Sequence, residues 1–262
     1  MISATGLAKT FNAGTASEKI AISGLDLDVA AGQFVAVIGG NGAGKSTLLN
    51  LLSGALSCDT GRIAIDGTDV TGMAEHRRAA FVARVFQDPM IGTAPSLTIE
   101  ENMALALMRT RSRTLRTALG RERRDTFRSA LATLKLGLEG RLEARADSLS
   151  GGQRQALALV MATLVPPRLL LLDEHTAALD PGTSQLVMDA TVALVADRGL
   201  TTLMVTHNMQ HALEYASRIV MMDRGRIVAD IGPDEIGGLT VAALVERFRL
   251  NDDRIVLNRG TH

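Results

Sequence analysis

A glycine-rich loop near the N-terminus places the strongest constraint on the fold of this chain. Residues 39–47 read GGNGAGKST, and the pattern G-x-x-x-x-G-K-[ST] is matched over residues 39–46. The loop follows an apolar run at 34–38 that is typical of a buried strand, and it precedes a helix-like run at 46–52. A loop of this kind between a strand and a helix predicts an α/β fold with an anion site at the helix N-terminus.

The residue types in this loop suit it to hold the phosphates of a nucleotide and a magnesium ion. Its glycines let the backbone curl so that successive N–H groups point at phosphate oxygens, and the helix N-terminus adds about half a positive charge. Lys45 would contact the terminal phosphates, and the Ser46 hydroxyl is a hard oxygen ligand for Mg²⁺. We therefore expect the nucleotide to lie against Gly39, Gly40, Asn41, Gly42, Ala43, Gly44, Lys45, Ser46 and Thr47.

A second motif supplies the acids that hydrolysis would need. Residues 169–174 read LLLLDE, an apolar strand pattern that ends in two carboxylates. Beside a phosphate loop, Asp173 can hold magnesium, and Glu174 can orient and deprotonate the attacking water. The motif is weak alone, because many buried strands end in acids, but a phosphate loop in the same chain makes it specific.

The composition excludes several other classes of protein. The 262 residues carry no formal net charge, so no general attraction to nucleic acid or anionic lipid is expected. No run approaches the length of a membrane span, and the first residues lack the apolar core of a secretory signal. Cys58 is the only cysteine, which excludes an internal disulfide, favours a reducing compartment and suggests a small packing residue. We expect a soluble protein that would reach a membrane only through a partner.

The pattern of apolar runs predicts an α/β protein with three parts. Short strand patterns at 2–9, 25–29 and 62–65 indicate an N-terminal antiparallel β layer beside a core sheet. Residues 98–138 hold no convincing strand and read as helices, whereas strands and helices alternate from residue 153 onward. The later elements are expected at 169–172, 183–197, 201–205 and 209–217, with a hairpin turn at 223–225. We therefore predict a mainly parallel core sheet of the P-loop NTPase type with a helical subdomain.

A third motif leads to a family resemblance. Residues 148–153 read SLSGGQ and precede an amphipathic run, so they form a helix N-terminus rich in glycine and hydroxyl groups. The LSGGQ segment at 149–153, together with the phosphate loop and LLLLDE, resembles the ATP-binding-cassette (ABC) ATPases. The resemblance runs over nearly the whole chain, from about residue 2 to residue 248.

The resemblance implies roles for three further residues. Gln87, in VFQDP, matches the loop glutamine that reaches magnesium and the attacking water, and Asp180 lies in the loop that contacts the partner subunit. His207 follows a predicted strand and matches the switch histidine that hydrogen-bonds the γ-phosphate. The resemblance therefore assigns catalysis to Glu174, His207, Gln87 and Lys45, and magnesium to Ser46, Gln87 and Asp173.

The resemblance also implies that two copies act together. In ABC ATPases, the LSGGQ segment of one subunit closes over the ATP that the phosphate loop of the other subunit holds. This chain has one copy of each, so it needs a second cassette, either another copy of itself or a paralogue. ATP would then be clamped by the Lys45 loop on one side and by Ser150, Gly151, Gly152 and Gln153 on the other.

Two positions depart from the family pattern. The family usually stacks adenine on an N-terminal aromatic residue, commonly tyrosine, whereas the only tyrosine here is Tyr215. Phe11 is the candidate for this contact, although it could instead be a core residue. His175 follows Glu174 at a position where the family often has proline, and it could touch the region of the γ-phosphate.

Two segments are similar to those of a subgroup of bacterial importer ATPases. Residues 85–102 (VFQDPMIGTAPSLTIEEN) and 169–181 (LLLLDEHTAALDP) resemble cassettes whose permeases are of the branched-chain amino-acid type, some of them linked to aromatic amino-acid uptake. The similarity implies a transmembrane permease, a solute-binding protein and a peripheral position on the cytoplasmic face of the inner membrane. Either the permease contact or the packing of the helical lobe would explain Met90, Ile91 and Leu97.

Other functions remain open at this level. An ATPase of iron–sulfur scaffold machinery would share every nucleotide motif, and an ABC exporter is a further alternative. A nucleic-acid-handling cassette is disfavoured by the neutral charge and by the lack of a second cassette or a long coiled coil.

We expect one ABC ATPase domain at 1–249, with a helical subdomain inserted at about 88–150, and a C-terminal tail at 250–262. The arginine-rich stretch at 109–128 is either a solvated face or a surface for an acidic partner loop or lipid headgroups.

Overall fold

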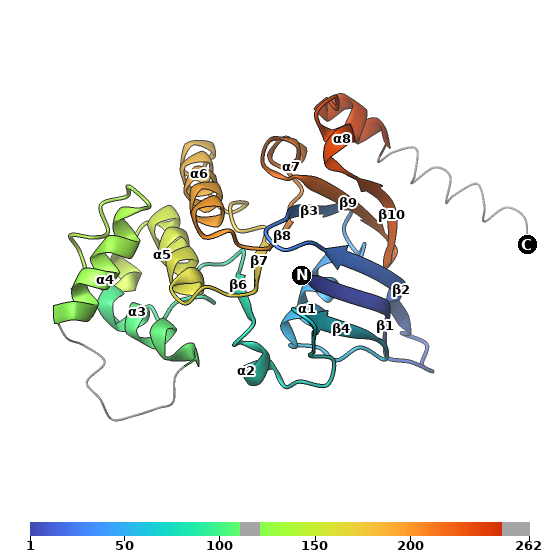
Figure 1. The fold of residues 1–262 in the computed structure, drawn as a ribbon, viewed down its shortest axis with the longest axis horizontal. Helices are drawn as coiled ribbons and strands as arrows, with labels where there is room; N and C mark the ends of the chain where they lie inside the picture. Colours follow the sequence, from blue (N-terminus) through green and yellow to red (C-terminus); the bar gives the residue numbers. More distant parts are fainter. Residues whose placement is uncertain (111–120, 248–262) are drawn as a thin grey trace, which may run out of the picture. The chain divides into compact units, whose positions relative to one another are not determined.

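The computed structural model describes residues 1–110 and 121–247, which form two compact units (Figure 1). Unit 1 comprises Met1–Arg78 and Thr201–His262, and unit 2 comprises Ala79–Leu200. The middle of the arginine-rich stretch and the expected C-terminal tail, residues 250–262, lie outside the described residues.

Unit 1 contains an antiparallel sheet with the strand order β2-β1-β4-β5. Its strands are β1 (Ile2–Phe11), β2 (Lys19–Val29), β4 (Thr60–Ile65) and β5 (Thr68–Asp69). In β2, the apolar residues at alternate positions are buried and the two aspartates between them are exposed, as expected when a core covers one face of a sheet. The β4–β5 hairpin turns at Asp66-Gly67, where both residues have the positive φ that a type I′ turn requires.

Unit 1 also contains strands in the order β10-β9-β3-β8, most of them parallel. β3 (Phe34–Gly39) pairs in parallel with β8 (Thr202–Val205) and β9 (Arg218–Asp223), and β10 (Arg226–Ile231) is antiparallel to β9. Five consecutive residues of β3 are buried, as expected for a parallel strand covered on both faces. The β9–β10 turn at Arg224-Gly225 again has positive φ at both residues.

Helix α1 (Lys45–Ser53) follows β3 directly after the glycine-rich loop. It buries four leucines and ends at Gly54, whose φ of 85° gives the left-handed conformation that commonly stops a helix. The described helices of unit 1 also include α2 (Glu75–Arg78), α7 (Met209–Tyr215) and α8 (Pro233–Ile236).

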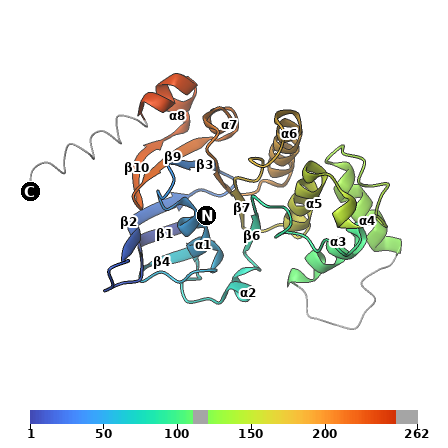
Figure 2. The same ribbon diagram turned by 180° about the vertical axis from the view of Figure 1, so that it is seen from behind.

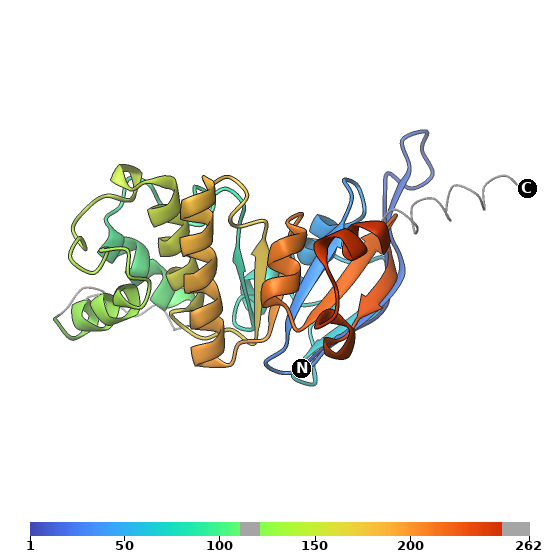
Figure 3. The ribbon, with the colours of Figure 1, turned by 90° about the horizontal axis from the view of Figure 1, so that it is seen from above.

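Unit 2 combines two parallel strands with a group of helices. β6 (Val82–Val85) pairs with β7 (Leu169–Asp173), whose leucines are all buried. Its helices include α3 (Ile99–Leu107), α4 (Arg121–Ala132), α5 (Gly151–Thr163) and α6 (Pro181–Arg198), with 3-10 turns at Met108–Thr110 and Ala146–Ser148. Helices α3, α4 and α5 pack against one another (Figure 2). Helix α6 lies beside α5 (Figure 3).

The α/β fold expected from the sequence is confirmed, with small differences in the elements. β2 begins at Lys19 rather than at residue 25, because the strand continues through Gly24 (φ 65°) with a shift in its register against β1. The region 98–138 contains α3 and α4 and no described strand. Among the residues that the structure describes, no helix is both long and apolar enough to cross a membrane.

Candidate active site

The glycine-rich loop of unit 1 is closed by its own lysine. Lys45 is the first residue of α1, and its Nζ donates to the carbonyl oxygens of Gly39 and Gly40 at 2.8 and 3.0 Å. Gly42 and Gly44 have φ of 81° and 103°, and this left-handed backbone makes the loop curl around the ammonium group. Lys45 is therefore already at the mouth of the loop, where phosphate oxygens could replace the two carbonyls as its partners.

Glycine is required at two of these positions because other backbone segments approach closely. A Cβ atom at Gly39 would lie 2.4 Å from the carbonyl oxygen of Met222 on β9. A Cβ atom at Gly44 would lie 2.6 Å from the carbonyl oxygen of Ala21 on β2. The pattern of glycines thus reflects packing within unit 1 as well as the chemistry of phosphate binding.

His207 leaves the same edge of the parallel strands as the phosphate loop. It follows β8, which pairs with β3, and the N–H of Thr206 donates to the carbonyl of Val37 at 3.2 Å. The carboxyl ends of adjacent parallel strands share one edge, and ligands of open α/β sheets bind at such edges. Asn208 then caps α7 by accepting from the N–H groups of Gln210 and His211, which fixes the exit of the chain beyond His207.

Phe11 lies at the end of β1 and is half-buried, so it is not a residue of the closed core. The Nζ of Lys9 lies 5.9 Å from the centre of its ring. The contact of Phe11 with adenine stays a prediction.

In unit 2, Asp173 and Gln87 also lie at one edge of parallel strands. Asp173 ends β7 and Gln87 follows β6, and these two strands pair in parallel. Arg84, which was not predicted from the sequence, contacts this aspartate: its Nη2 donates to Asp173 Oδ2 at 2.5 Å. The Arg84 guanidinium also lies 4.8 Å from the centre of the Phe86 ring. An arginine within an otherwise apolar strand was the signal that could have revealed it.

Gln87 is supported by a helix that the sequence analysis did not connect to it. The Nε2 of Gln155, on α5, donates to the carbonyl of Phe86 at 2.9 Å, and Gln155 is almost fully buried. Carboxylate and amide oxygens such as those of Asp173 and Gln87 are ligands that Mg²⁺ prefers. No group of three or more His, Cys, Asp or Glu side chains in the described residues is arranged for a metal.

Glu174 occupies a turn directly after β7. Its φ of 46° is in the left-handed region, which residues other than glycine rarely adopt. His175 does not reach outward toward a phosphate as the sequence analysis suggested, because its side chain is buried against α6 and its Nε2 lies 3.1 Å from Thr191 Oγ1.

The LSGGQ segment forms the N-terminus of α5 through a reciprocal capping box. Ser150 Oγ accepts from the N–H of Gln153 at 3.3 Å, and Gln153 Oε1 accepts from the N–H of Ser150 at 3.3 Å. The guanidinium of Arg154 donates to the carbonyls of Ala146, Asp147 and Leu149, so the turn before the helix is also held. The helix start is exposed at Ser150 and Gly151.

Asp180 caps helix α6. Its Oδ1 accepts from the N–H of Thr183 at 3.0 Å, and Pro181 follows at the first helical position, where its missing N–H costs nothing. Hydrogen bonds from the Thr183 hydroxyl and N–H lower the pKa of Asp180, so the carboxylate stays charged at the helix N-terminus. The predicted contact of Asp180 with a partner subunit stays a prediction.

The candidates for a permease contact differ in exposure. Met90 and Ile91 are 44% and 64% exposed, whereas Leu97 is half-buried and its carbonyl accepts from the N–H of Ala146. Met90 also contacts the helical lobe, because its Sδ accepts from the Nη1 of Arg154 on α5 at 2.6 Å. The predicted permease contact stays a prediction.

Comparison with known proteins agrees with the geometry of these motifs. A family model described as ABC transporter matches residues 22–177, more than half of the chain. A tyrosine transport ATP-binding protein of Clostridioides difficile (strain R20291) is 43% identical over 248 residues, which are 95% of this chain and 98% of that protein. The lipoprotein-releasing system ATP-binding protein LolD of Ruegeria pomeroyi is 39% identical, over 86% of this chain and 96% of that protein.

A solved structure shows the same fold as a dimer. It is the post-hydrolysis state of the ATP-binding cassette MJ0796 with ADP and Pi, which aligns with a TM-score of 0.76 and 27% identity over 89% of this chain and 99% of that one. The chain therefore belongs to the ABC transporter family. Within that family it is the ATP-binding, ATP-hydrolysing subunit, and the cassette fold expected from the sequence is confirmed.

Proposed function

We propose that this chain powers a solute importer for an amino acid or a related small molecule. The observation that carries this proposal is the 43% identity with a tyrosine transport ATP-binding protein along almost the full length of both chains. The partners are a second cassette, most simply another copy, and a transmembrane permease that receives its solute from a binding protein. The chain acts at the cytoplasmic face of the cell membrane, with Met90 and Ile91 as the exposed apolar residues of the permease contact.

The proposed domain is a single cassette at 1–249 with a helical subdomain at about 88–150. The phosphate loop with Lys45 and the ring of Phe11 hold ATP, and the segment 150–153 of the partner copy closes over it. Magnesium, held by Ser46, Gln87 and Asp173, would neutralise charge on the phosphates when it is bound. Glu174 positions and deprotonates water, His207 contacts the γ-phosphate, and Asp180 meets the partner subunit.

The mechanism is tested by two substitutions in the purified chain. For Glu174→Gln we expect normal ATP binding, very little hydrolysis and an ATP-bound dimer on size exclusion, because the clamp closes and water is not activated. For Lys45→Ala we expect a loss of nucleotide affinity, because the ammonium no longer offsets phosphate charge. Hydrolysis by Glu174→Gln at the wild-type rate, or unchanged binding by Lys45→Ala, would remove these residues from their assigned roles.

Transport is tested in cells that lack this chain. We expect reduced uptake of radiolabelled tyrosine or a related amino acid, restored by the wild-type chain and not by Glu174→Gln. An affinity-tagged chain should co-purify with a membrane permease. Co-purification with iron–sulfur scaffold proteins would favour an ATPase of that assembly machinery instead. Unchanged uptake together with reduced export of a solute would favour an ABC exporter. The export measurement is needed because the chain is also similar to LolD, a protein of a lipoprotein-releasing system.

A further inference from the structure

The turn that carries Glu174 is held in an unfavourable backbone conformation. Glu174 has φ 46°, and a glutamate adopts this left-handed conformation only when its surroundings enforce it. The residue before it ends β7, where the Asp173 carboxylate accepts from Arg84. The turn closes through the carbonyl of Glu174, which accepts from the N–H of Ala177 at 2.9 Å. His175 follows Glu174, so its side chain is the other neighbour that could hold the turn in this conformation.

The side chain of His175 is anchored in the middle of helix α6. It is 2% exposed, and its Nε2 lies 3.1 Å from the Oγ1 of Thr191, which is itself fully buried. The Thr191 hydroxyl donates its single proton to the carbonyl of Val187 at 2.7 Å. Its oxygen must therefore accept from His175, which makes Nε2 the protonated nitrogen of the ring.

A chain of two hydrogen bonds thus joins the turn to α6, from imidazole to hydroxyl to helix carbonyl. Both bonds are buried, so neither competes with water, and breaking one leaves a polar group unsatisfied. Because only two rotatable bonds separate the imidazole ring from Cα, holding Nε2 restricts the backbone of His175 and therefore the peptide that joins it to Glu174. Proline, the usual family residue at this position, would offer no such side-chain bond.

We propose that His175 is a positioning residue for hydrolysis, which holds Glu174 at the angle from which its carboxylate reaches water. This inference rests on the proposed role of Glu174 as the base. The imidazole touches neither nucleotide nor water in this scheme. His175 acts by restricting the backbone of the turn that carries Glu174, and its hydrogen bond to Thr191 on α6 provides that restriction.

The experiment uses the purified full-length chain and steady-state ATP hydrolysis. His175→Phe keeps an aromatic ring and Thr191→Val keeps the size and branching of the side chain, and both remove the bond. For each we expect kcat to fall about tenfold while KM and the Kd for ATP stay within about twofold. The double variant should lose no more than either single variant, because both break the same link. His175→Gln places an amide N–H near the position of Nε2, and Thr191→Ser keeps the hydroxyl, so both should recover most of the rate.

The outcomes separate this inference from the proposed function. Three results would each overturn the positioning role. They are losses of rate that multiply in the double variant, a KM that rises while kcat is unchanged, and equal rates for Thr191→Val and Thr191→Ser. If His175→Phe does not fold, the two Thr191 variants still decide the question, with their unfolding midpoints measured beside wild type. Should Glu174→Gln hydrolyse normally, the role of Glu174 itself fails; a nearly inactive Glu174→Gln with a fully active His175→Phe overturns only this inference.

Discussion

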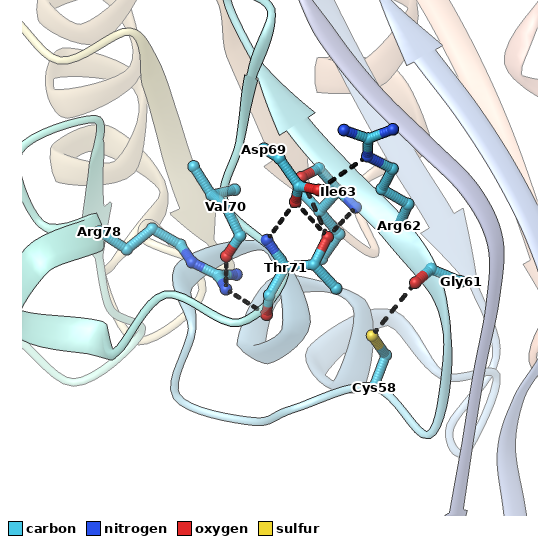
Figure 4. A network of polar contacts seen from close by, with 8 residues as sticks. All are labelled: Cys58, Gly61, Arg62, Ile63, Asp69, Val70, Thr71 and Arg78. Atoms are coloured by element: carbon cyan, nitrogen blue, oxygen red, sulfur yellow. Dashed lines mark hydrogen bonds and ion pairs between the residues drawn. The ribbon is translucent and has the colours of Figure 1, made fainter.

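At the scale of single residues, Arg78 joins helix α1 to the loop after β5 in unit 1. Figure 4 shows its contacts with the carbonyls of Val70 and Thr71 in that loop. Its side chain is 2% exposed, and burial lowers the pKa of the guanidinium, so the charge must be offset by its surroundings. The guanidinium is surrounded by backbone carbonyls to which it donates, those of Leu51, Leu52, Val70, Thr71 and Met73. Two of these belong to the C-terminal turn of α1, where the helix dipole favours a cation.

We expect Arg78→Met to lower the free energy of unfolding by about 3 kcal/mol, because it leaves several buried carbonyls without a donor. Urea denaturation of the purified chain measures this change. The control is Arg77→Met, whose arginine is exposed and should change stability by less than about 0.5 kcal/mol. Equal midpoints for the two variants would show that the carbonyls find other partners.

The position of Lys45 within its loop could be predicted from the sequence, whereas the contacts of Arg78 and Arg84 could not. A loop motif fixes the neighbours of Lys45 within a few positions along the chain, so its contacts follow from spacing. The partners of Arg78 come from α1 and from the loop after β5, and the partner of Arg84 comes from another strand. A buried arginine is recognisable only when the carbonyls or carboxylates that surround it are known.

At the scale of elements, α5 and α6 approach so closely that a glycine is needed between them. A Cβ atom on Gly152, at the start of α5, would lie 2.0 Å from Thr183 Cγ2 on α6. The sequence predicts the cap of α5, because Ser150 and Gln153 have capping-box spacing. It does not predict this approach, which depends on the register between two helices and not on either helix alone.

The two hairpin turns were predictable because each has glycine where positive φ is required.

We expect Gly152→Ala to lower the free energy of unfolding by about 1–3 kcal/mol, because the new methyl group overlaps Thr183 Cγ2. Adding Thr183→Ser removes that methyl group but keeps the hydroxyl near Asp180, so the double variant should regain most of the stability. Gly151→Ala is the matched control, since its nearest neighbour would be Leu179 Cδ2 at an ordinary 3.4 Å. Thermal or urea unfolding of the three variants measures the effect. No gain from Thr183→Ser would mean that the overlap is relieved elsewhere in unit 2.

At the scale of the whole molecule, the two halves of the proposed nucleotide clamp occur once each in the sequence. The phosphate loop belongs to unit 1 and the LSGGQ segment to unit 2, and the related cassette MJ0796 has been solved as a dimer. A symmetric pair would use each half twice, so every site would combine the loop of one copy with the segment of the other. Turnover should then depend on association, and activity per molecule should fall on dilution.

Mixing two inactive variants tests this arrangement directly. Lys45→Ala damages only the phosphate loop, and Ser150→Phe blocks only the LSGGQ segment, so each variant alone should form no intact site. In an equal mixture about half of the dimers contain both variants, and one of their two sites combines an intact loop with an intact segment. We therefore expect the mixture to recover about a quarter of the wild-type ATPase rate if the two sites work independently. Two affinity tags, one on each variant, verify that mixed dimers form. If their rate is no higher than that of the separate variants, either each chain hydrolyses ATP within itself or one impaired site also inactivates the other. Dilution separates these cases, because only hydrolysis within one chain keeps its rate per molecule when the protein dissociates.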